Sequence, residues 1–322
     1  MQISRFNKTY LKYFSFIIFF ICIFIVSLEV YNNINFITDL IALNFKYVYI
    51  LLVLQFSFLF LYNYRFFFSY NFFLKKKIKF SHWTYYFFKS LIYNNLLNFL
   101  GTVYRALFLK KRGISYVKST GILYLLYFSY LFLSLFLILF GTLFFTNLIL
   151  VLKILFILFS LAIFFFIYFL KKIITFIIKR KILAKITYSV INEFFIFKNY
   201  FKKKSLNNFF ILNLFGNGAI LFVIEIFIFF FAYRIFFSDS YYSNIFLLFA
   251  ILFILDKIPF IGNIIGVSEI LYGFIFVNVG LDFYQGVVIK LICRVTGIIA
   301  LVASYAGFLI FQLGIKSKLI KI

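Results

Sequence analysis

The sequence contains very few of the residues from which catalytic and metal sites are usually built. Its 322 residues include one His, one Pro, two Cys and eight Asp or Glu. One His and scattered carboxylates supply neither a Ser-His-Asp triad nor an HExxH zinc motif, and no phosphate-binding Gly-Lys motif occurs. Cys22 and Cys293 lie in separate apolar stretches without a CxxC partner, so they indicate neither a disulfide framework nor a thiolate metal site. We therefore expect no catalytic residues, no metal and no cofactor.

The chain also lacks any long polar stretch and any linker rich in Gly, Ser and Pro, which leaves no room for a soluble catalytic domain. Apolar residues take their place. Hydrophobic residues make up 66% of the chain and aromatic residues 26%, which is more than the core of a water-soluble protein of this length can bury. The composition predicts an all-α polytopic membrane protein.

Positive charge greatly exceeds negative charge, with 33 Lys and Arg against eight Asp and Glu and a formal net charge of +25. The basic residues form clusters that alternate with apolar runs, as expected when they face the cytosol and its anionic lipid leaflet. We therefore expect membrane lipids, and not nucleic acid, as partners. The clusters lie at the N-terminus, at Arg65 with Lys75 to Lys79, at Lys110 to Lys118, between Lys171 and Lys204, and at Lys316 to Lys321.

The apolar runs predict about six full transmembrane helices, because a helix needs about 20 apolar residues to cross a bilayer. The predicted spans are 13–30, 46–64, 120–141, 146–170, 207–233 and 286–314. The first lacks a small-residue cleavage site and is interpreted as a retained signal anchor. His82, Trp83, Tyr85 and Tyr86 follow a basic cluster, which is the usual position of an interfacial aromatic belt. Six crossings of the inner or plasma membrane place both termini in the cytoplasm.

The segment 83–108 is apolar but lies between two strongly basic clusters, so a full crossing would leave one cluster outside. A re-entrant hairpin removes this conflict, since non-helical backbone at membrane depth is tolerated where protein or a water-filled cavity surrounds it. Asn94, Asn98 and Gly101 supply side-chain amides and a flexible turn. We expect the helix to break here.

The second half of the chain repeats this arrangement in the opposite orientation. Residues 244–255 are too few for a full span, and Asp256, Lys257 and Pro259 follow them. Asn263-Ile-Ile-Gly266 then matches the earlier Asn98-Phe-Leu-Gly101. Broken helices at equivalent places of two inverted halves typically form the substrate site of a transporter. The sequence therefore predicts one transmembrane domain, residues 1–322, with two re-entrant hairpins and inverted halves of 1–142 and 143–322.

A few ionisable residues lie within apolar segments, where each costs about 2.5–3.5 kcal/mol unless it has a partner or a wet cavity. Arg105 follows Gly101 by four residues and either snorkels to the interface or binds substrate. Glu269 has no cation close in sequence, so we expect its partner on another segment, and its place after the second Asn-x-x-Gly predicts that it meets Arg105 in one lipid-headgroup site. Lys290 and Arg294 lie one helical turn apart, so one can neutralise Glu269 and leave the other for a lipid phosphate, unless Lys290 snorkels outward. Glu225 lies mid-span and is either a proton carrier or a protonated, packed carboxyl group.

These residues resemble the lysylphosphatidylglycerol synthase transmembrane domain, a family of flippase-like membrane proteins, over nearly the whole chain. The likeness rests on Asn95, Asn98, Gly101, Arg105 and Leu109-Lys-Lys-Arg-Gly-Ile114, and later on Pro259, Gly262, Gly266-Val-Ser-Glu269, Gly280 and Arg294. The chain departs from the family pattern at Thr102, where members often have Glu, and before Gly101, where they often have Pro. The resemblance implies translocation of a lipid or a lipid-linked substrate. The soluble aminoacyl-transfer domain of some members has no counterpart in these residues.

The sequence thus predicts a membrane protein that translocates or binds a phospholipid or a polyprenyl-phosphate-linked substrate in a central polar cavity. Arg105 and Arg294 would bind the phosphate, and Glu269 would position or neutralise them. Two alternatives stay open, a membrane-embedded enzyme acting on a polyprenyl-linked sugar and a non-transporting partner of an envelope glycosyltransferase or lipid-modifying enzyme. The candidate substrate-binding residues are Asn98, Gly101, Arg105, Asn263, Gly266, Glu269, Lys290 and Arg294, and the candidate proton carrier is Glu225.

Overall fold

The computed structural model describes residues 21–74, 77–96, 100–145, 208–237, 242–257 and 266–319, and all regular secondary structure within them is helical. This confirms the all-α prediction. Four described helical segments are long and apolar enough to cross a membrane: Phe45–Phe73, Ser119–Ile138, Leu212–Arg234 and Phe283–Gln312. They coincide with the predicted spans 46–64, 120–141, 207–233 and 286–314. The predicted span 146–170 lies outside the described residues, and 13–30 is described only from residue 21.

The chain divides into two compact units, each assembled from separate stretches of sequence. Unit 1 is Met1–Ser57 with Glu225–Ala300, and unit 2 is Phe58–Ile224 with Leu301–Ile322. Unit 1 contains α2 (Ile34–Leu43), α10 (Tyr242–Asp256) and α11 (Val267–Asn278), and unit 2 contains α4 (Phe80–Leu96), α5 (Leu100–Lys110) and α6 (Tyr116–Phe145). The residue ranges of α3 (Phe45–Phe73), α9 (Asn208–Arg234) and α12 (Phe283–Leu319) include residues of both units. The inverted halves 1–142 and 143–322 stay a prediction.

The two units differ sharply in charge. Seven of the eight acidic residues belong to unit 1, and the remaining one, Glu193, belongs to unit 2 but lies outside the described residues. Unit 2 nevertheless holds 25 of the 33 Lys and Arg. Cations in unit 1 can therefore be neutralised within the unit, whereas the described residues of unit 2 include no Asp or Glu.

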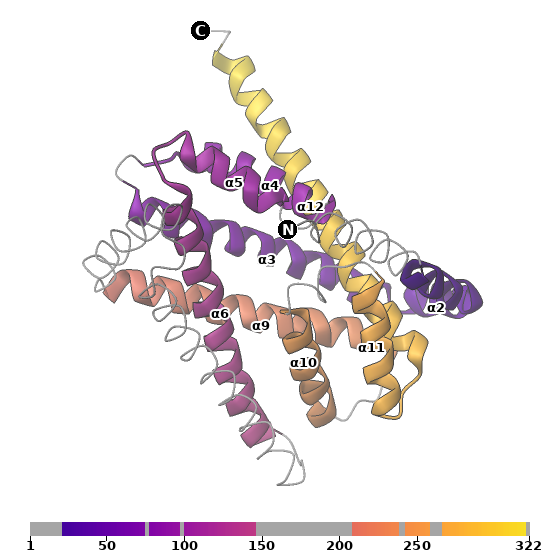
Figure 1. Cartoon of the computed structure of the whole chain (residues 1–322). Helices are drawn as coiled ribbons and strands as arrows, with labels where there is room; N and C mark the ends of the chain where they lie inside the picture. The colour runs from indigo at the N-terminus through magenta and orange to yellow at the C-terminus, as the bar shows by residue number, and fades with distance from the viewer. Residues whose placement is uncertain are drawn as a thin grey trace, which may run out of the picture. The chain divides into compact units, whose positions relative to one another are not determined.

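Helices α4 and α5 form a broken pair in unit 2. They have 17 and 11 residues, which correspond to about 26 and 17 Å of helix, so neither matches a hydrocarbon core about 30 Å thick. The two helices contact each other and lie side by side in Figure 1. Their close approach depends on Gly101, because a β-carbon there would overlap the backbone carbonyl oxygen of Ser90 and lie 2.7 Å from Asn94 Oδ1.

Replacement of Gly101 by Ala is expected to destabilise the protein, because α5 must move away from α4 to admit the methyl group. Overpacking of this kind typically costs about 1–3 kcal/mol. Gly307 of α12 provides the matched control, since a β-carbon there meets nothing within 4 Å, and Gly307→Ala gains up to about 1 kcal/mol of helix propensity. Thermal unfolding in detergent compares the two variants. Equal unfolding temperatures would contradict the close approach of α4 and α5.

Helices α5 and α11 end in the same way, with a glycine in the left-handed region. Gly113 has φ 84° and Gly280 has φ 80°. The N–H of Gly113 donates to the carbonyl of Lys110, and the N–H of Ile114 donates to that of Leu109. The corresponding bonds after α11 run from Gly280 to Val277 and from Leu281 to Phe276. These are the paired bonds of a Schellman motif, which requires a residue that tolerates positive φ. The Lys-Lys-Arg-Gly sequence after α5 is thus a helix C-terminus.

Two residues lie in surroundings that differ from the sequence-based interpretation. Arg65 was expected in a cytosolic basic cluster, but α3 continues to Phe73 and the Arg65 side chain is buried, donating from Nη2 to the carbonyl of Leu126 (3.2 Å) and to Ser129 Oγ (2.9 Å). Trp83 was expected in an interfacial aromatic belt, and its side chain is only 1% exposed. Neighbouring helices within unit 2 therefore cover both side chains, and the depth of each in the membrane stays a prediction.

Candidate functional site

Most of the candidate polar residues of unit 1 belong to three ion pairs that join different helices. Each pair brings a cation to a carboxylate that is distant in sequence. The pairs are Lys257–Glu225 at 3.1 Å, Lys290–Asp256 at 2.6 Å and Arg294–Glu269 at 2.7 Å. Because an isolated charge in an apolar environment is costly, these pairings account for the presence of charges in otherwise apolar helices.

Glu269 lies in the first turn of α11 and is fully buried, with 0% of its surface exposed. Its Oε2 accepts hydrogen bonds from the backbone N–H of Gly266 (2.7 Å) and from Ser268 Oγ (3.0 Å). Its Oε1 pairs with Arg294 Nη1 of α12, and Arg294 Nη2 also donates to Ser268 Oγ (2.9 Å). A partner from another segment was predicted, and Arg294 is that partner. The cluster caps the N-terminus of α11 and ties it to α12.

Lys290 is not left over for an anion, as the sequence-based interpretation allowed. Its Nζ lies 2.6 Å from both carboxylate oxygens of Asp256. The hydroxyl of Tyr272 donates to Asp256 Oδ2, also at 2.6 Å. Sequence reasoning treated Asp256 only as a helix breaker. The sequence did contain a signal for this ion pair: a carboxylate directly after a 12-residue apolar run needs a cation in order to be buried.

Glu225 of α9 pairs with Lys257, which follows α10. The Lys257 ammonium also lies 4.4 Å from the ring centroid of Phe253. The sequence showed no partner for Glu225, and the structure supplies one. The carboxylate is about one-fifth exposed, at 19%, so it is neither fully enclosed nor open to solvent. Its role as a proton carrier stays a prediction.

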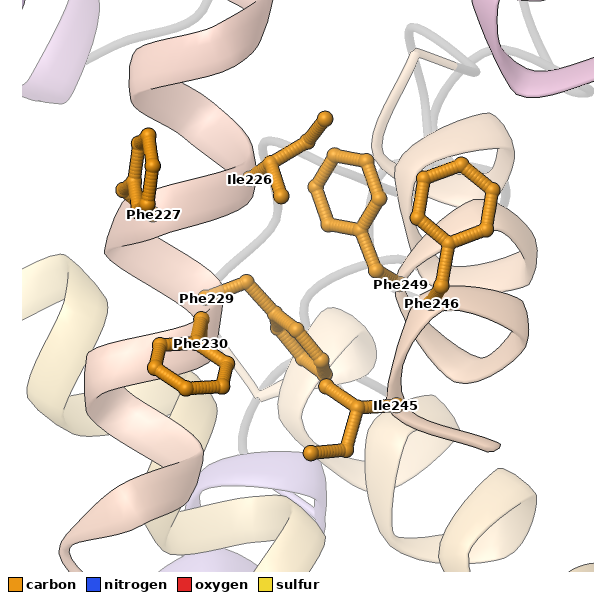
Figure 2. Close-up of a pocket in the computed structure, with 7 residues that line it drawn as sticks. All are labelled: Ile226, Phe227, Phe229, Phe230, Ile245, Phe246 and Phe249. Carbon is orange, nitrogen blue, oxygen red and sulfur yellow. The ribbon is translucent and has the colours of Figure 1, made fainter. Parts of the chain in front are cut away.

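An apolar cavity of about 210 Å³ lies between α9 and α10 (Figure 2), and its first lining residue, Ile226, directly follows Glu225 in the sequence. Figure 2 shows Ile226 and Phe229 pointing from α9 toward α10, and the ring centroids of Phe229 and Phe249 are 5.7 Å apart. All seven lining side chains are apolar: Ile226, Phe227, Phe229, Phe230, Ile245, Phe246 and Phe249. Such a cavity can accept a hydrocarbon chain and provides no side-chain hydrogen bond to a polar group.

Arg105 differs from Lys257, Lys290 and Arg294 because it is buried and has no counterion within the part of the chain that the structure describes. It lies on α5, is 5% exposed, and its guanidinium carbon is 5.0 Å from the ring centroid of Phe66 and 5.7 Å from that of Phe87. Among the described residues, its Nη1 has no hydrogen-bond partner and no carboxylate pairs with it. Aromatic faces stabilise the cation but do not cancel its charge. Arg105 therefore keeps the capacity to bind an anion.

The other candidates divide into those with a structural contact and those outside the described residues. Gly101 supports the packing of α4 on α5, and Gly266 supplies the N-terminal backbone N–H that Glu269 caps. Asn98 and Asn263 lie outside the described residues. Within the described ranges, no three His, Cys, Asp or Glu side chains gather as metal ligands would.

Comparison with known proteins identifies one family. The family model described as "Lysylphosphatidylglycerol synthase TM region" matches residues 13–304, which is most of the chain. No curated protein and no solved structure matches.

Proposed function

Because this chain belongs to the family of lysylphosphatidylglycerol synthase TM regions, integral membrane proteins that act on lipids, we propose that it binds and translocates an amphipathic lipid carrying a phosphate. The lipid is a phospholipid or a polyprenyl-phosphate-linked substrate. The protein performs no chemical reaction on it. The membrane is the inner or plasma membrane, with both termini in the cytoplasm.

The observation that carries this proposal is the buried guanidinium of Arg105, which pairs with no carboxylate among the described residues. Removing a cation from water without a counterion costs several kcal/mol, and the contacts with the rings of Phe66 and Phe87 offset only part of that cost. A guanidinium provides a fork of N–H donors that matches the oxygens of a phosphate. Among the described residues, Nη1 of Arg105 has no hydrogen-bond partner, which supports its role as the group that binds the lipid phosphate.

The candidate cations of unit 1 have a different role from Arg105. Arg294 and Lys290 already face carboxylates at 2.7 and 2.6 Å, so they position α11 and the end of α10 relative to α12. This supports Arg105, rather than Arg294, as the principal phosphate ligand. We propose that transport is passive or driven by an ion gradient, with Glu225 as the proton carrier.

The two broken helix pairs support an inverted-repeat architecture. Gly101 of the first Asn-x-x-Gly sequence is the second residue of α5, Gly266 of the second sequence directly precedes α11, and both helices end in a Schellman motif. α11, like α5, is too short to cross a bilayer, with 12 residues. Re-entrant hairpins at equivalent places would expose backbone groups near the bilayer midplane, where Asn98 and Asn263 would hydrogen-bond them.

Reconstitution in vesicles tests the proposed function. The purified protein is incorporated with a panel of fluorescent lipids, namely phosphatidylglycerol, phosphatidylethanolamine, a polyprenyl phosphate and a phosphate-free diacylglycerol. A membrane-impermeant quencher then measures movement between leaflets. We expect transfer of at least one phosphate-containing lipid, no transfer of diacylglycerol, and loss of transfer in Arg105→Gln. Transfer of none of these lipids, or undiminished transfer in Arg105→Gln, would overturn the proposal.

The re-entrant hairpin predicts that Lys77 and Arg112, which flank α4 and α5 and are both exposed, lie on the same side of the membrane. Single cysteines at these positions, in a background with Cys22 and Cys293 changed to Ala, are labelled with an impermeant reagent in intact and opened cells. The two cysteines are expected to respond alike, so that each condition labels both of them or neither. Opposite accessibility would mean that the segment crosses the membrane.

A further inference from the structure

Lys89 of α4 is surrounded by tyrosine side chains from two helices. Its Nζ lies 5.8 Å from the ring centroid of Tyr85, 6.0 Å from that of Tyr93 and 5.8 Å from that of Tyr104 of α5. Tyr85 and Tyr93 are one turn before and after Lys89, so all three share a face of α4. Tyr305 of α12 extends the cluster, 6.0 Å from Tyr85 between ring centroids.

The surroundings of Lys89 are unlike those of the unit 1 lysines. Lys257 and Lys290 each lie over one aromatic ring, at 4.4 and 4.6 Å, and each also faces a carboxylate. Lys89 has three rings and, among the described residues, no carboxylate. Aromatic faces favour the protonated amine without neutralising it. The net positive charge is therefore available to an external anion.

We propose that Lys89 with Tyr85, Tyr93 and Tyr104 forms a binding site for the phosphodiester group of an anionic membrane phospholipid. The ammonium group supplies the charge and three N–H donors, and the phenolic hydroxyls supply further donors to phosphate oxygens. This Lys89 site is partly exposed, whereas Arg105 is buried. The Lys89 site is proposed as a separate site, and the proposal does not depend on lipid binding by Arg105.

The surface of α5 favours a lipid over free phosphate as the ligand. Leu100, Val103 and Leu107 are exposed, at 43%, 53% and 47%, and their spacing places them along one side of the helix. Tyr104 lies one turn from both Leu100 and Leu107, so this apolar stripe begins beside the Lys89 site. A lipid whose phosphate contacts Lys89 can place a hydrocarbon chain along the stripe. Inorganic phosphate has no hydrocarbon chain and gains nothing from this surface.

Lipid titration in the Arg105→Gln background isolates the Lys89 site from the proposed transport site. The probe is short-chain phosphatidylglycerol added to the protein in neutral detergent, with bound lipid measured by native mass spectrometry. Lys89→Gln is expected to weaken binding about tenfold, the effect of losing one charge-assisted hydrogen bond. Lys89→Arg should retain binding, and Tyr104→Phe, which keeps the ring but loses the hydroxyl, should weaken it by a smaller factor.

Three comparisons decide the result. Lys110→Gln is the matched control, because Lys110 lies 4.6 Å from the single ring of Tyr116, and it should leave binding unchanged. Short-chain phosphatidylcholine should bind more weakly than phosphatidylglycerol, and millimolar inorganic phosphate should not displace the lipid. Unchanged affinity in Lys89→Gln at an unchanged melting temperature would overturn the site. An equal loss of lipid affinity in Lys110→Gln would show that the Lys89 site is not specific. Displacement of the lipid by inorganic phosphate would overturn the assignment of the ligand as a lipid.

Discussion

Replacement of Glu269 by Ala is expected to destabilise the protein by about 3–5 kcal/mol, because it leaves the partly buried Arg294 guanidinium without its counterion. The same change removes the acceptor for the Gly266 backbone N–H, and loss of a helix cap adds about 1 kcal/mol. Glu269→Gln keeps an acceptor for the Gly266 backbone N–H and should lose less stability than Glu269→Ala. Unfolding titrated with sodium dodecyl sulfate in mixed micelles measures these differences.

A double-variant cycle separates the ion pair from the cap. If Arg294 and Glu269 stabilise one another, Glu269→Gln with Arg294→Gln should be more stable than the sum of the single losses implies. Glu225→Gln serves as the control, since the Lys257–Glu225 pair is longer and more exposed, and it should cost less than Glu269→Gln. If the stability losses of the two single variants simply add in the double variant, the ion pair is not the cause of the destabilisation.

Arg105→Gln is expected to lose lipid transport completely while unfolding at the same temperature as the wild type or a higher one. The guanidinium is buried and, among the described residues, has no counterion, so its removal relieves a desolvation cost instead of breaking a pair. Functional residues often carry this trade-off between activity and stability. Transport in vesicles and thermal unfolding in detergent are measured on the same preparation.

Arg65 provides the matched control for Arg105, because both are buried arginines of unit 2. Arg65 donates to Leu126 and Ser129, so Arg65→Gln removes hydrogen bonds between α3 and α6 and should lower the unfolding temperature. Arg105→Lys should keep the charge but lose the guanidinium fork, and we expect it to retain weak transport. A fall in unfolding temperature for Arg105→Gln as large as that for Arg65→Gln would indicate a structural role for Arg105.

Properties that depend on neighbouring residues could be predicted from the sequence. Hydropathy and segment length predicted the helical spans at 46–64, 120–141, 207–233 and 286–314, because the apolar length needed to cross a bilayer is a local property of the chain. The interruption around Asn98 was visible for the same reason, and α4 ends at Leu96 while α5 begins at Leu100. The motif around Arg105 and Glu269 was sufficient to indicate the family that the whole-chain match then identified.

Partner choice and burial were decided only by the tertiary structure. Lys290 and Asp256 are 34 residues apart, Arg294 pairs with Glu269 of another helix, and no local pattern states which of several cations a carboxylate meets. The same holds for Arg65, which hydropathy placed in a surface cluster and α6 buries, and for Lys89, which acquires Tyr104 from α5 and lies near Tyr305 of α12. Pairing energies depend on distance and on exclusion of water, and both are set by which helices pack together.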